Sequence, residues 1–176
     1  MKIALTDVET TGLDSKKHEI LEIGLVVFDS EPLFEIYDTL DIKVKPEHIE
    51  TAEPKALEIN GYNKADWEEA LPLKEAMELY WDKAQGCMFA SHNVAFDYSF
   101  IGPCPHRFDT SNYHKLDTFT LAWIKIPHDK IKRWNLKSIC EYLEIEPEPA
   151  VHRGINGAQA AYNVYTRLMS GTIGLL

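Results

Sequence analysis

The sequence has few cysteines, no long apolar run and a shortage of positive charge. Its three cysteines, Cys87, Cys104 and Cys140, are widely spaced and form no CxxC pair. This spacing excludes a disulfide framework or a zinc knuckle and favours buried, reduced thiols. No stretch approaches the ~20 apolar residues that a membrane span needs, and Asp7 arrives before the apolar core of a signal peptide is complete. The sequence therefore predicts a cytoplasmic protein that does not act at a membrane.

Acidic residues outnumber basic residues by 28 to 18, which gives a formal net charge of -10. This balance argues against a broad basic surface that grips long duplex nucleic acid. It is compatible with an enzyme that touches only a few terminal nucleotides, because divalent cations held by carboxylates supply local positive charge beside the phosphates. The charge therefore limits the size of a nucleic-acid footprint more than it limits the class of substrate.

The length and the order of the patterns predict a single α/β domain over residues 1–176. With 176 residues, of which 45% are hydrophobic, the chain is long enough to bury a core of its own. Alternating or β-branched apolar runs predict strands at 2–8, 19–28, 34–44 and 87–90, the first three forming an antiparallel meander. Helical spacing of apolar residues predicts helices at 71–84, 95–101, 118–124, 136–143 and 157–168.

Two carboxylates, Asp7 and Glu9, lie at i and i+2 at the end of the first expected strand. They therefore project from the same face of the sheet, where they repel each other unless a cation lies between them. Oxygen ligands in this position suit Mg2+ or Mn2+ better than zinc. A DxE pair taken alone is far more often a solvated strand end.

The context of this pair is more specific, because the string from Asp7 to Leu13 reads DVETTGL. It resembles the first motif of the DEDD exonuclease superfamily, DxETTGL. The resemblance implies that Thr10, Thr11, Gly12 and Leu13 contact the terminal nucleotide of a substrate. Without the resemblance, the same residues would predict a polar turn between two strands.

A second string, HNVAFD at residues 92–97, follows the short expected strand. It resembles the second motif of these exonucleases, HNxxFD. We expect Asn93 to cap the helix that follows, and Asp97, one turn inside that helix, to face back towards the strand ends. The resemblance adds His92, Asn93 and Phe96 to the candidate substrate contacts.

The third motif of the family is HRxxxDA, and here the chain reads HRGINGA from His152. Gly157 stands where the family has a metal-binding aspartate. The neighbouring Asn156 is neutral and is displaced by ~100° around a helix, so it is a poor substitute for an anionic ligand. His152 suits the family role of general base, because imidazole exchanges protons near neutral pH.

Other residues receive weaker predictions. Asp117 is expected to cap a helix or to accept a supporting hydrogen bond. Arg153 and the cluster Lys130, Lys132 and Arg133 are candidate phosphate contacts, and a solvated run of charge explains them equally well. Trp123 and Trp134 could stack on a base, although core packing is the commoner role of tryptophan.

Together the three motifs resemble the DEDDh 3′-to-5′ exonucleases, which include bacterial polymerase III proofreading subunits and ribonuclease T. The resemblance implies an RNase H-like fold with a mixed five-stranded sheet, flanked by helices. It also implies hydrolysis of phosphodiester bonds at the 3′ end of single-stranded DNA or RNA, with two Mg2+ or Mn2+ ions. Asp7, Glu9 and Asp97 would bind the ions, and His152 would take the proton of the attacking water. A polymerase or another replication or repair protein is the implied protein partner.

Three explanations of Gly157 stay open at the level of sequence. The chain could be an inactive variant, or a natural degenerate exonuclease that binds 3′ ends without cutting them. Alternatively, a carboxylate elsewhere, such as Glu148 in the Glu-Pro-Glu-Pro segment, could complete the site. The first two explanations predict weak metal binding and slow turnover, and the alternative function is that of a nuclease-fold module that binds nucleic-acid 3′ ends or a protein.

Overall fold

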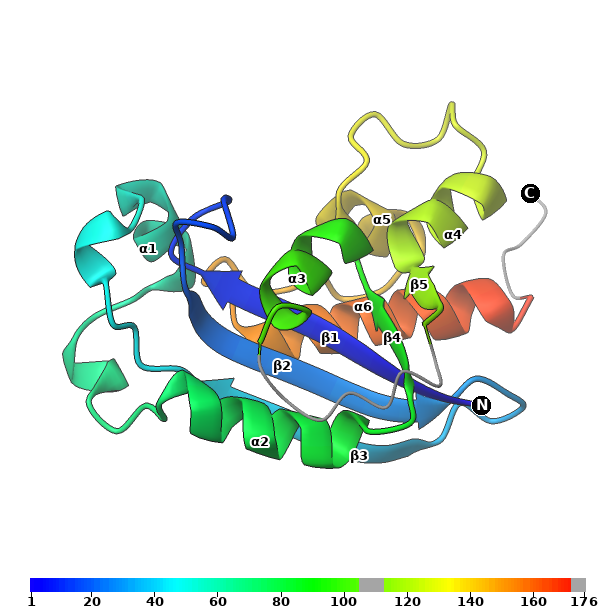
Figure 1. Cartoon of the computed structure of the whole chain (residues 1–176). Helices are drawn as coiled ribbons and strands as arrows, with labels where there is room; N and C mark the ends of the chain where they lie inside the picture. The colour runs from blue at the N-terminus through cyan, green and yellow to red at the C-terminus, as the bar shows by residue number, and fades with distance from the viewer. Residues whose placement is uncertain (105–112, 172–176) are drawn as a thin grey trace.

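A computed structural model describes residues 1–104 and 113–171 of the chain. Its centre is a five-stranded sheet in the order β3-β2-β1-β4-β5 (Figure 1). The three longer strands, β1 (Lys2–Thr10), β2 (Ile20–Asp29) and β3 (Ile36–Lys43), form an antiparallel meander. β4 (Met88–Ser91) runs parallel to β1, and β5 (Lys115–Asp117) runs parallel to β4. The expected mixed sheet with an antiparallel beginning is confirmed.

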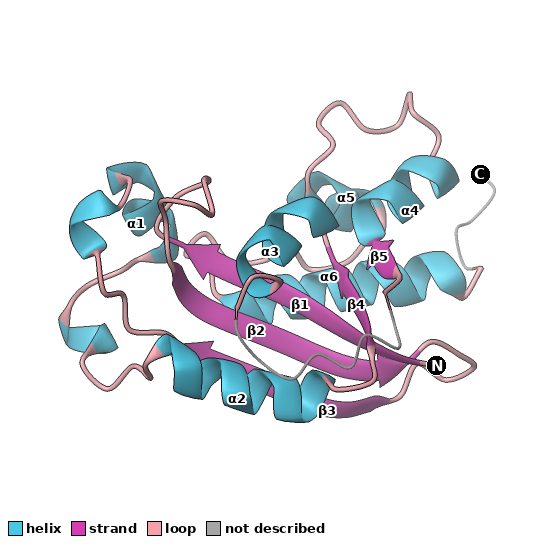
Figure 2. Ribbon diagram, in the orientation of Figure 1, coloured by secondary structure: helices cyan, strands magenta, loops and turns pink. Residues whose placement is uncertain are grey.

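Helices cover both faces of this sheet. They are α1 (Pro54–Asn60), α2 (Leu73–Ala84), α3 (Val94–Ile101), α4 (Thr118–Lys125), α5 (Leu136–Tyr142) and α6 (Gly154–Met169), with short 3-10 turns at Ile49–Thr51 and Ala65–Trp67. Figure 2 shows α2 and α3 in front of the sheet and α6 behind it. No helix in the described part of the chain is long and apolar enough to span a bilayer.

The two faces of β1 separate two halves of the core. Ala4 and Val8 pack on the side of α2 and α3, whereas Ile3 and Leu5 pack on the side of α6. Because side chains alternate along a strand, the residues that continue the α6 side beyond Leu5 are Asp7 and Glu9. The face under α6 is therefore apolar at one end and acidic at the other.

Local sequence explains where some helices begin. Asp117 caps α4, since its carboxylate accepts hydrogen bonds from the Phe119 backbone N–H (3.2 Å) and the Thr120 hydroxyl (2.6 Å). Its expected role as a helix cap is confirmed. Two elements were not predicted: α1, which begins at a proline that suits a first helical position, and β5, which is only 3 residues long. α6 also begins earlier than expected, at Gly154.

The first turn of α6 crosses β2 at a contact between two glycines. A Cβ on Gly24 would overlap the backbone carbonyl group of Gly154, and a Cβ on Gly154 would lie 2.6 Å from the Gly24 nitrogen. Backbone atoms cannot rotate away, so neither position has room for a side chain. This contact fixes the height of α6 above the acidic end of the sheet.

We therefore expect Gly24→Ala to destabilise the protein by about 3 kcal/mol or more, at the upper end of the cost of overpacking. The measurement is thermal or denaturant unfolding. Gly86→Ala is the control, because a Cβ there meets nothing within 4 Å and its cost is limited to the ~1–2 kcal/mol of a left-handed residue. A Gly24→Ala protein as stable as the Gly86→Ala protein would contradict the close contact.

Candidate metal and nucleic-acid site

The carboxylates of Asp7 and Glu9 lie at the end of β1, beneath the first turn of α6. Asp7 is opposite Gly24 and Glu9 is opposite Glu22 in the neighbouring strand. The Glu9 side chain is only 10% exposed. Among the described residues, no hydrogen-bond donor serves either carboxylate, although His152 approaches Glu9. Buried charge without donors is costly, so this arrangement suits a bound cation.

Asp97 joins this pair from α3. It is 2% exposed, and its carboxylate accepts a hydrogen bond of 3.0 Å from the Val8 backbone N–H. The pairing of β1 with β4 ends at Leu5 and Ala90, so Val8 lies beyond the reach of β4 and Asp97 takes the place of a strand neighbour. The predicted convergence of residues 7, 9 and 97 thus has a structural cause.

Electrostatics at this point favour protonation when no cation is bound. Burial raises the pKa of Asp7 well above its usual value, and the negative charges of Asp97 and Glu9 add to the effect. Burial likewise raises the pKa of Glu9 to about 8 and that of Asp97 to about 7. Loss of hydration is the larger cause and like charge the smaller, and a divalent cation would oppose both.

The third motif brings His152 and Glu148 to the same place. His152 Nδ1 lies 3.8 Å from a Glu9 carboxylate oxygen and 3.6 Å from one of Glu148. The His152 backbone N–H donates to the Ile59 carbonyl of α1 at 3.1 Å, which fixes the segment. Ligand atoms of Glu9, Glu148 and His152 all lie within 4.8 Å of one another, a spacing that allows a shared cation.

Gly157 lies in the first turn of α6, directly over Asp7. A Cβ at this position would overlap Asp7 Oδ2 and would lie 2.6 Å from Asp7 Cγ and 2.9 Å from Asp7 Oδ1. The Asp7 carboxylate therefore occupies the volume that a side chain at position 157 would need. An aspartate there would force Asp7 to turn away.

A second layer of contacts holds the third motif in place, and its key residue, Glu22, was missed by the sequence analysis. Glu22 is fully buried, accepts a hydrogen bond of 3.2 Å from Gly154 N–H and lies 3.5 Å from the Arg153 guanidinium. Arg153 also donates to the backbone carbonyl of Asn60. The side-chain amide of Asn60 in turn donates to the Thr10 carbonyl at 2.9 Å. Arg153, a candidate phosphate contact, is thus engaged inside the fold. The signal for Glu22 was available: it is an acidic residue inside an apolar strand.

The predicted substrate contacts of the first motif form a tight turn. The Thr10 hydroxyl donates to Gly12 O at 2.8 Å, and the Thr11 hydroxyl accepts from Glu19 N–H at 2.8 Å. Thr11 is fully buried, whereas Leu13 is 76% exposed. The threonine side chains therefore shape the turn, and Leu13 is presented to solvent beyond it.

This turn lines a cavity of about 290 Å3. Six predicted site residues border it: Glu9, Thr10, Gly12, Leu13, Phe96 and His152. The opposite wall comes from α1, through Lys55, Ala56 and Ile59. These were not predicted, although Ala56 and Ile59 show the i, i+3 spacing of one helix face. Glu9 and Glu53 give this cavity an acidic part, and Ala56, Ile59 and Phe96 give it an apolar part.

His92 and Asn93 lie outside this cavity. His92 Nδ1 lies 3.0 Å from the Thr118 hydroxyl, and burial lowers the pKa of His92 to about 4, so the ring is neutral. Asn93 has a left-handed backbone, with φ of 73°, and its side chain caps nothing. The expectation that Asn93 caps α3 is wrong, because its backbone N–H instead donates to Asp117 at 2.9 Å.

The two tryptophans considered as candidates for base stacking pack against each other. The rings of Trp123 and Trp134 lie 4.5 Å apart between centroids, with His128 against both. Trp123 keeps 42% of its surface exposed. Neither ring borders the cavity over Glu9, and the same holds for Lys130, Lys132 and Arg133.

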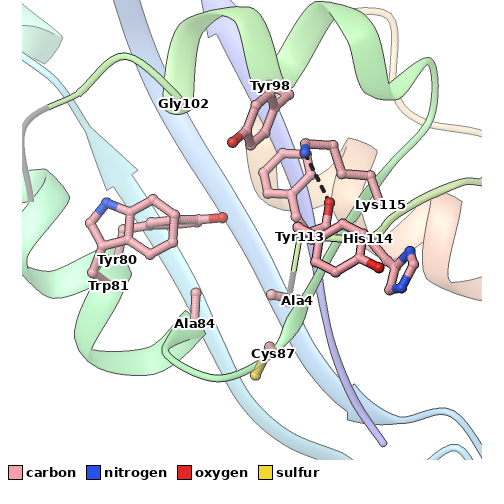
Figure 3. Close-up of a pocket in the computed structure, with 11 residues that line it drawn as sticks. Ala4, Tyr80, Trp81, Ala84, Cys87, Tyr98, Gly102, Tyr113, His114 and Lys115 are labelled. Atoms are coloured by element: carbon pink, nitrogen blue, oxygen red, sulfur yellow. Dashed lines mark hydrogen bonds between the residues drawn. The ribbon is translucent and has the colours of Figure 1, made fainter. Parts of the chain in front are cut away.

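A second cavity, of about 200 Å3, has a different character (Figure 3). Aromatic rings of Tyr80, Trp81 and Tyr98 border it, and the Lys115 ammonium lies 3.9 Å from the centre of the Tyr98 ring. None of its lining residues is acidic and none belongs to the three motifs. This cavity therefore does not share the acidic character of the cavity over Glu9.

Comparison with known proteins places this geometry in a family. The exonuclease family model (RNase_T) matches residues 5–165. A PolC-type DNA polymerase III from Caldanaerobacter subterraneus subsp. tengcongensis is 27% identical over 165 residues, which make up 93% of this chain and 11% of the polymerase. Ribonuclease T from Shewanella sp. (strain ANA-3) is 34% identical over 139 residues, or 69% of this chain and 63% of that protein. The chain thus spans less than two thirds of the length of either relative.

Solved structures share the architecture. E. coli exonuclease I in complex with a dT13 oligonucleotide matches 97% of this chain and 41% of its own, with a TM-score of 0.77 and 14% identity. The nuclease domain of 3′hExo, a DEDDh family member bound to rAMP, matches 97% of this chain and 92% of its own, with a TM-score of 0.68 and 18% identity. The chain therefore belongs to the exonuclease family and has the RNase H-like α/β fold of its DEDDh members.

Proposed function

We propose that the protein is a metal-dependent 3′-to-5′ exonuclease that hydrolyses the terminal phosphodiester bond of single-stranded DNA or RNA and releases 5′-mononucleotides. One observation carries the proposal. Asp7 and Glu9 of the first motif lie beside Asp97 of the second. Glu9 and Asp97 are buried and Asp7 is partly buried. Asp7 and Glu9 have no hydrogen-bond donors within the described residues. Such a cluster has a physical reason to exist if cations neutralise it.

The donor set fits Mg2+ or Mn2+. Hard divalent cations prefer carboxylate oxygens, and Asp7, Glu9 and Asp97 offer only these. Bound ions would supply charge neutralisation at the scissile phosphate and would acidify the attacking water. The protein's own part is to hold three carboxylates rigidly, through β1 and through the hydrogen bond from Val8 to Asp97.

His152 is placed to remove the proton of the water. Its ring is about half exposed, with a side-chain exposure of 46%, and it borders the cavity beside Glu9. Carboxylates of Glu148 and Glu9 lie 3.6 and 3.8 Å from Nδ1 and orient the ring. The proton would therefore move from water to His152 and then to solvent.

The size of the cavity supports action at chain ends. A volume of about 290 Å3 accommodates a terminal nucleotide far better than a duplex, and the chain carries a net charge of -10, which disfavours long phosphate contacts. Leu13, Phe96 and Ile59 border the space from three sides. They would hold the last base by apolar contact, without reading its identity.

A second function is tested alongside the first, because glycine occupies position 157, where the family motif has a metal-binding aspartate. If the carboxylates bind ions too weakly for hydrolysis, the protein is a module that binds 3′ ends or a partner. The relative of PolC type favours a polymerase, or another replication or repair protein, as that partner. Binding of single strands without shortening would support this function over the first.

The direct test is an oligonucleotide ladder. We expect Mn2+ to drive stepwise shortening of 5′-labelled single-stranded DNA or RNA from the 3′ end, and EDTA to stop it. Asp7→Asn should lower the rate by about 100-fold or more, because a ligand of the ions is lost. Asp82→Asn, at an exposed position of α2, is the matched control and should leave the rate unchanged. Release of the 5′ label as a mononucleotide at the outset would contradict the proposed polarity.

The walls of the cavity make a separate prediction. Ile59→Ala and Phe96→Leu should raise KM roughly 5-fold to 50-fold, in line with the contribution of one base contact, and should change kcat much less. Leu79→Ala, at a half-exposed position of α2, is the control. Steady-state kinetics on a short oligonucleotide provide the measurement, and an unchanged KM in both variants would place the substrate elsewhere.

A further inference from the structure

The site lacks one carboxylate by comparison with the motif that it resembles, because position 157 is a glycine. A Cβ on Gly157 would overlap Asp7 Oδ2. A side chain added there would require the Asp7 carboxylate to shift, whereas glycine lets that carboxylate lie against the first turn of α6. Any fourth anionic ligand has to reach the cluster from another element.

Glu148 reaches it from the segment before α6. Its carboxylate is 13% exposed and lies 3.6 Å from His152 Nδ1, on the side where Glu9 approaches the same nitrogen at 3.8 Å. The second oxygen of Glu148 accepts a hydrogen bond of 3.0 Å from the Arg153 backbone N–H. One oxygen is thus anchored to the third motif, and the other faces the cluster.

The backbone around Glu148 supports this placement. Pro147 and Pro149 flank it, and proline restricts both its own φ and the residue before it. The segment therefore holds an extended course with little freedom. Glu146, two residues earlier, is exposed to solvent, so the two glutamates of the Glu-Pro-Glu-Pro segment have different surroundings.

The burial of Glu9 is a second observation that points to a cation in this cluster. Glu9 is nine-tenths buried, has no hydrogen-bond donor among the described residues, and faces a second carboxylate, that of Glu148. The permanent positive charge of Arg153 is engaged with Glu22 and Asn60. Two facing carboxylates with only a titratable histidine between them are stable when a divalent ion bridges them.

We infer that Glu148 is the fourth metal-binding carboxylate of this site and replaces the aspartate that Gly157 cannot supply. The inference rests on the proposed function, since it concerns the same ions. Glu148, Glu9 and His152 then share one end of the cluster, and Asp7 and Asp97 hold the other. Glu148 would bind the ion and also contact His152. His152 itself would take the proton of the water.

Binding of Mn2+ alone, measured by isothermal titration calorimetry and by the loss of the free Mn2+ electron paramagnetic resonance signal, tests this inference. We expect Glu148→Gln to weaken Mn2+ binding by at least about 10-fold, and Glu148→Asp, which keeps the charge, to weaken it less. Glu146→Gln is the matched control and should bind as the unchanged chain does. Circular dichroism melting would establish that each variant is folded.

The outcomes separate this inference from the proposed function. If the unchanged chain binds no Mn2+, the proposed function itself fails. If Asp7→Asn abolishes binding and Glu148→Gln leaves it intact, the function stands and the role of Glu148 is refuted. A change only in the pH profile of kcat for Glu148→Gln, at unchanged Mn2+ affinity, would make Glu148 a positioning residue for His152 and would also overturn the inference.

Gly157→Asp gives an opposite test. We expect no gain in Mn2+ affinity, because the new side chain would displace the Asp7 carboxylate. A gain above about 10-fold, or 1.4 kcal/mol, would mean that the site is incomplete without residue 157 and would overturn the role of Glu148.

Discussion

Negative charge that is buried without hydrogen-bond donors constrains everything around the end of β1. Asp7 and Glu9 lie under a helix, and Asp97 and Glu148 approach from two other elements. The fold compensates part of the negative charge in this region, since the Gly154 N–H at the start of α6 donates to Glu22, which lies opposite Glu9. A helix terminus contributes only about half an elementary charge, so it cannot balance several carboxylates. Protonation or bound cations must remove the rest of the charge, and carboxylates held together in this way suit divalent cations.

The rigidity that such ions demand comes from contacts outside the site. Glu22, Arg153, Asn60 and Thr10 form a continuous path from β2 through the third motif and α1 to the turn after β1. Glu22 has one carboxylate oxygen without a hydrogen bond, and Arg153 offsets its charge from 3.5 Å. Because this path links the substrate cavity to the segment of His152, the base and the nucleotide-binding wall are held in one unit.

The sequence predicted the elements and the convergence of the motifs, and it failed where the outcome depended on close packing. Strand alternation placed Asp7 and Glu9 on one face, and the motif spacing brought Asp97 to them, because both follow from periodicity. Periodicity says nothing about how near two backbones approach. The Gly24–Gly154 contact and the overlap of position 157 with Asp7 therefore stayed hidden, as did Glu22, whose partner lies 132 positions away. α1 was missed because 7 residues carry too little periodic signal.

The chain departs from the family pattern in having glycine at position 157, and Glu148 approaches the site from another segment. These two features are parts of a single arrangement. Glycine at positions 154 and 157 allows α6 to lie close to β1 and β2. The Asp7 carboxylate then occupies the volume that a side chain at position 157 would fill. With the helix so near, an acidic ligand is better delivered from a stiff segment at the edge of the site than from the helix itself. Glu148, fixed by its neighbouring prolines and by Arg153 N–H, satisfies that condition. Both features depend on the height of α6 above the sheet. Changing Gly157 or Glu148 alone should therefore disturb the environment of the other residue and should not restore a conventional site.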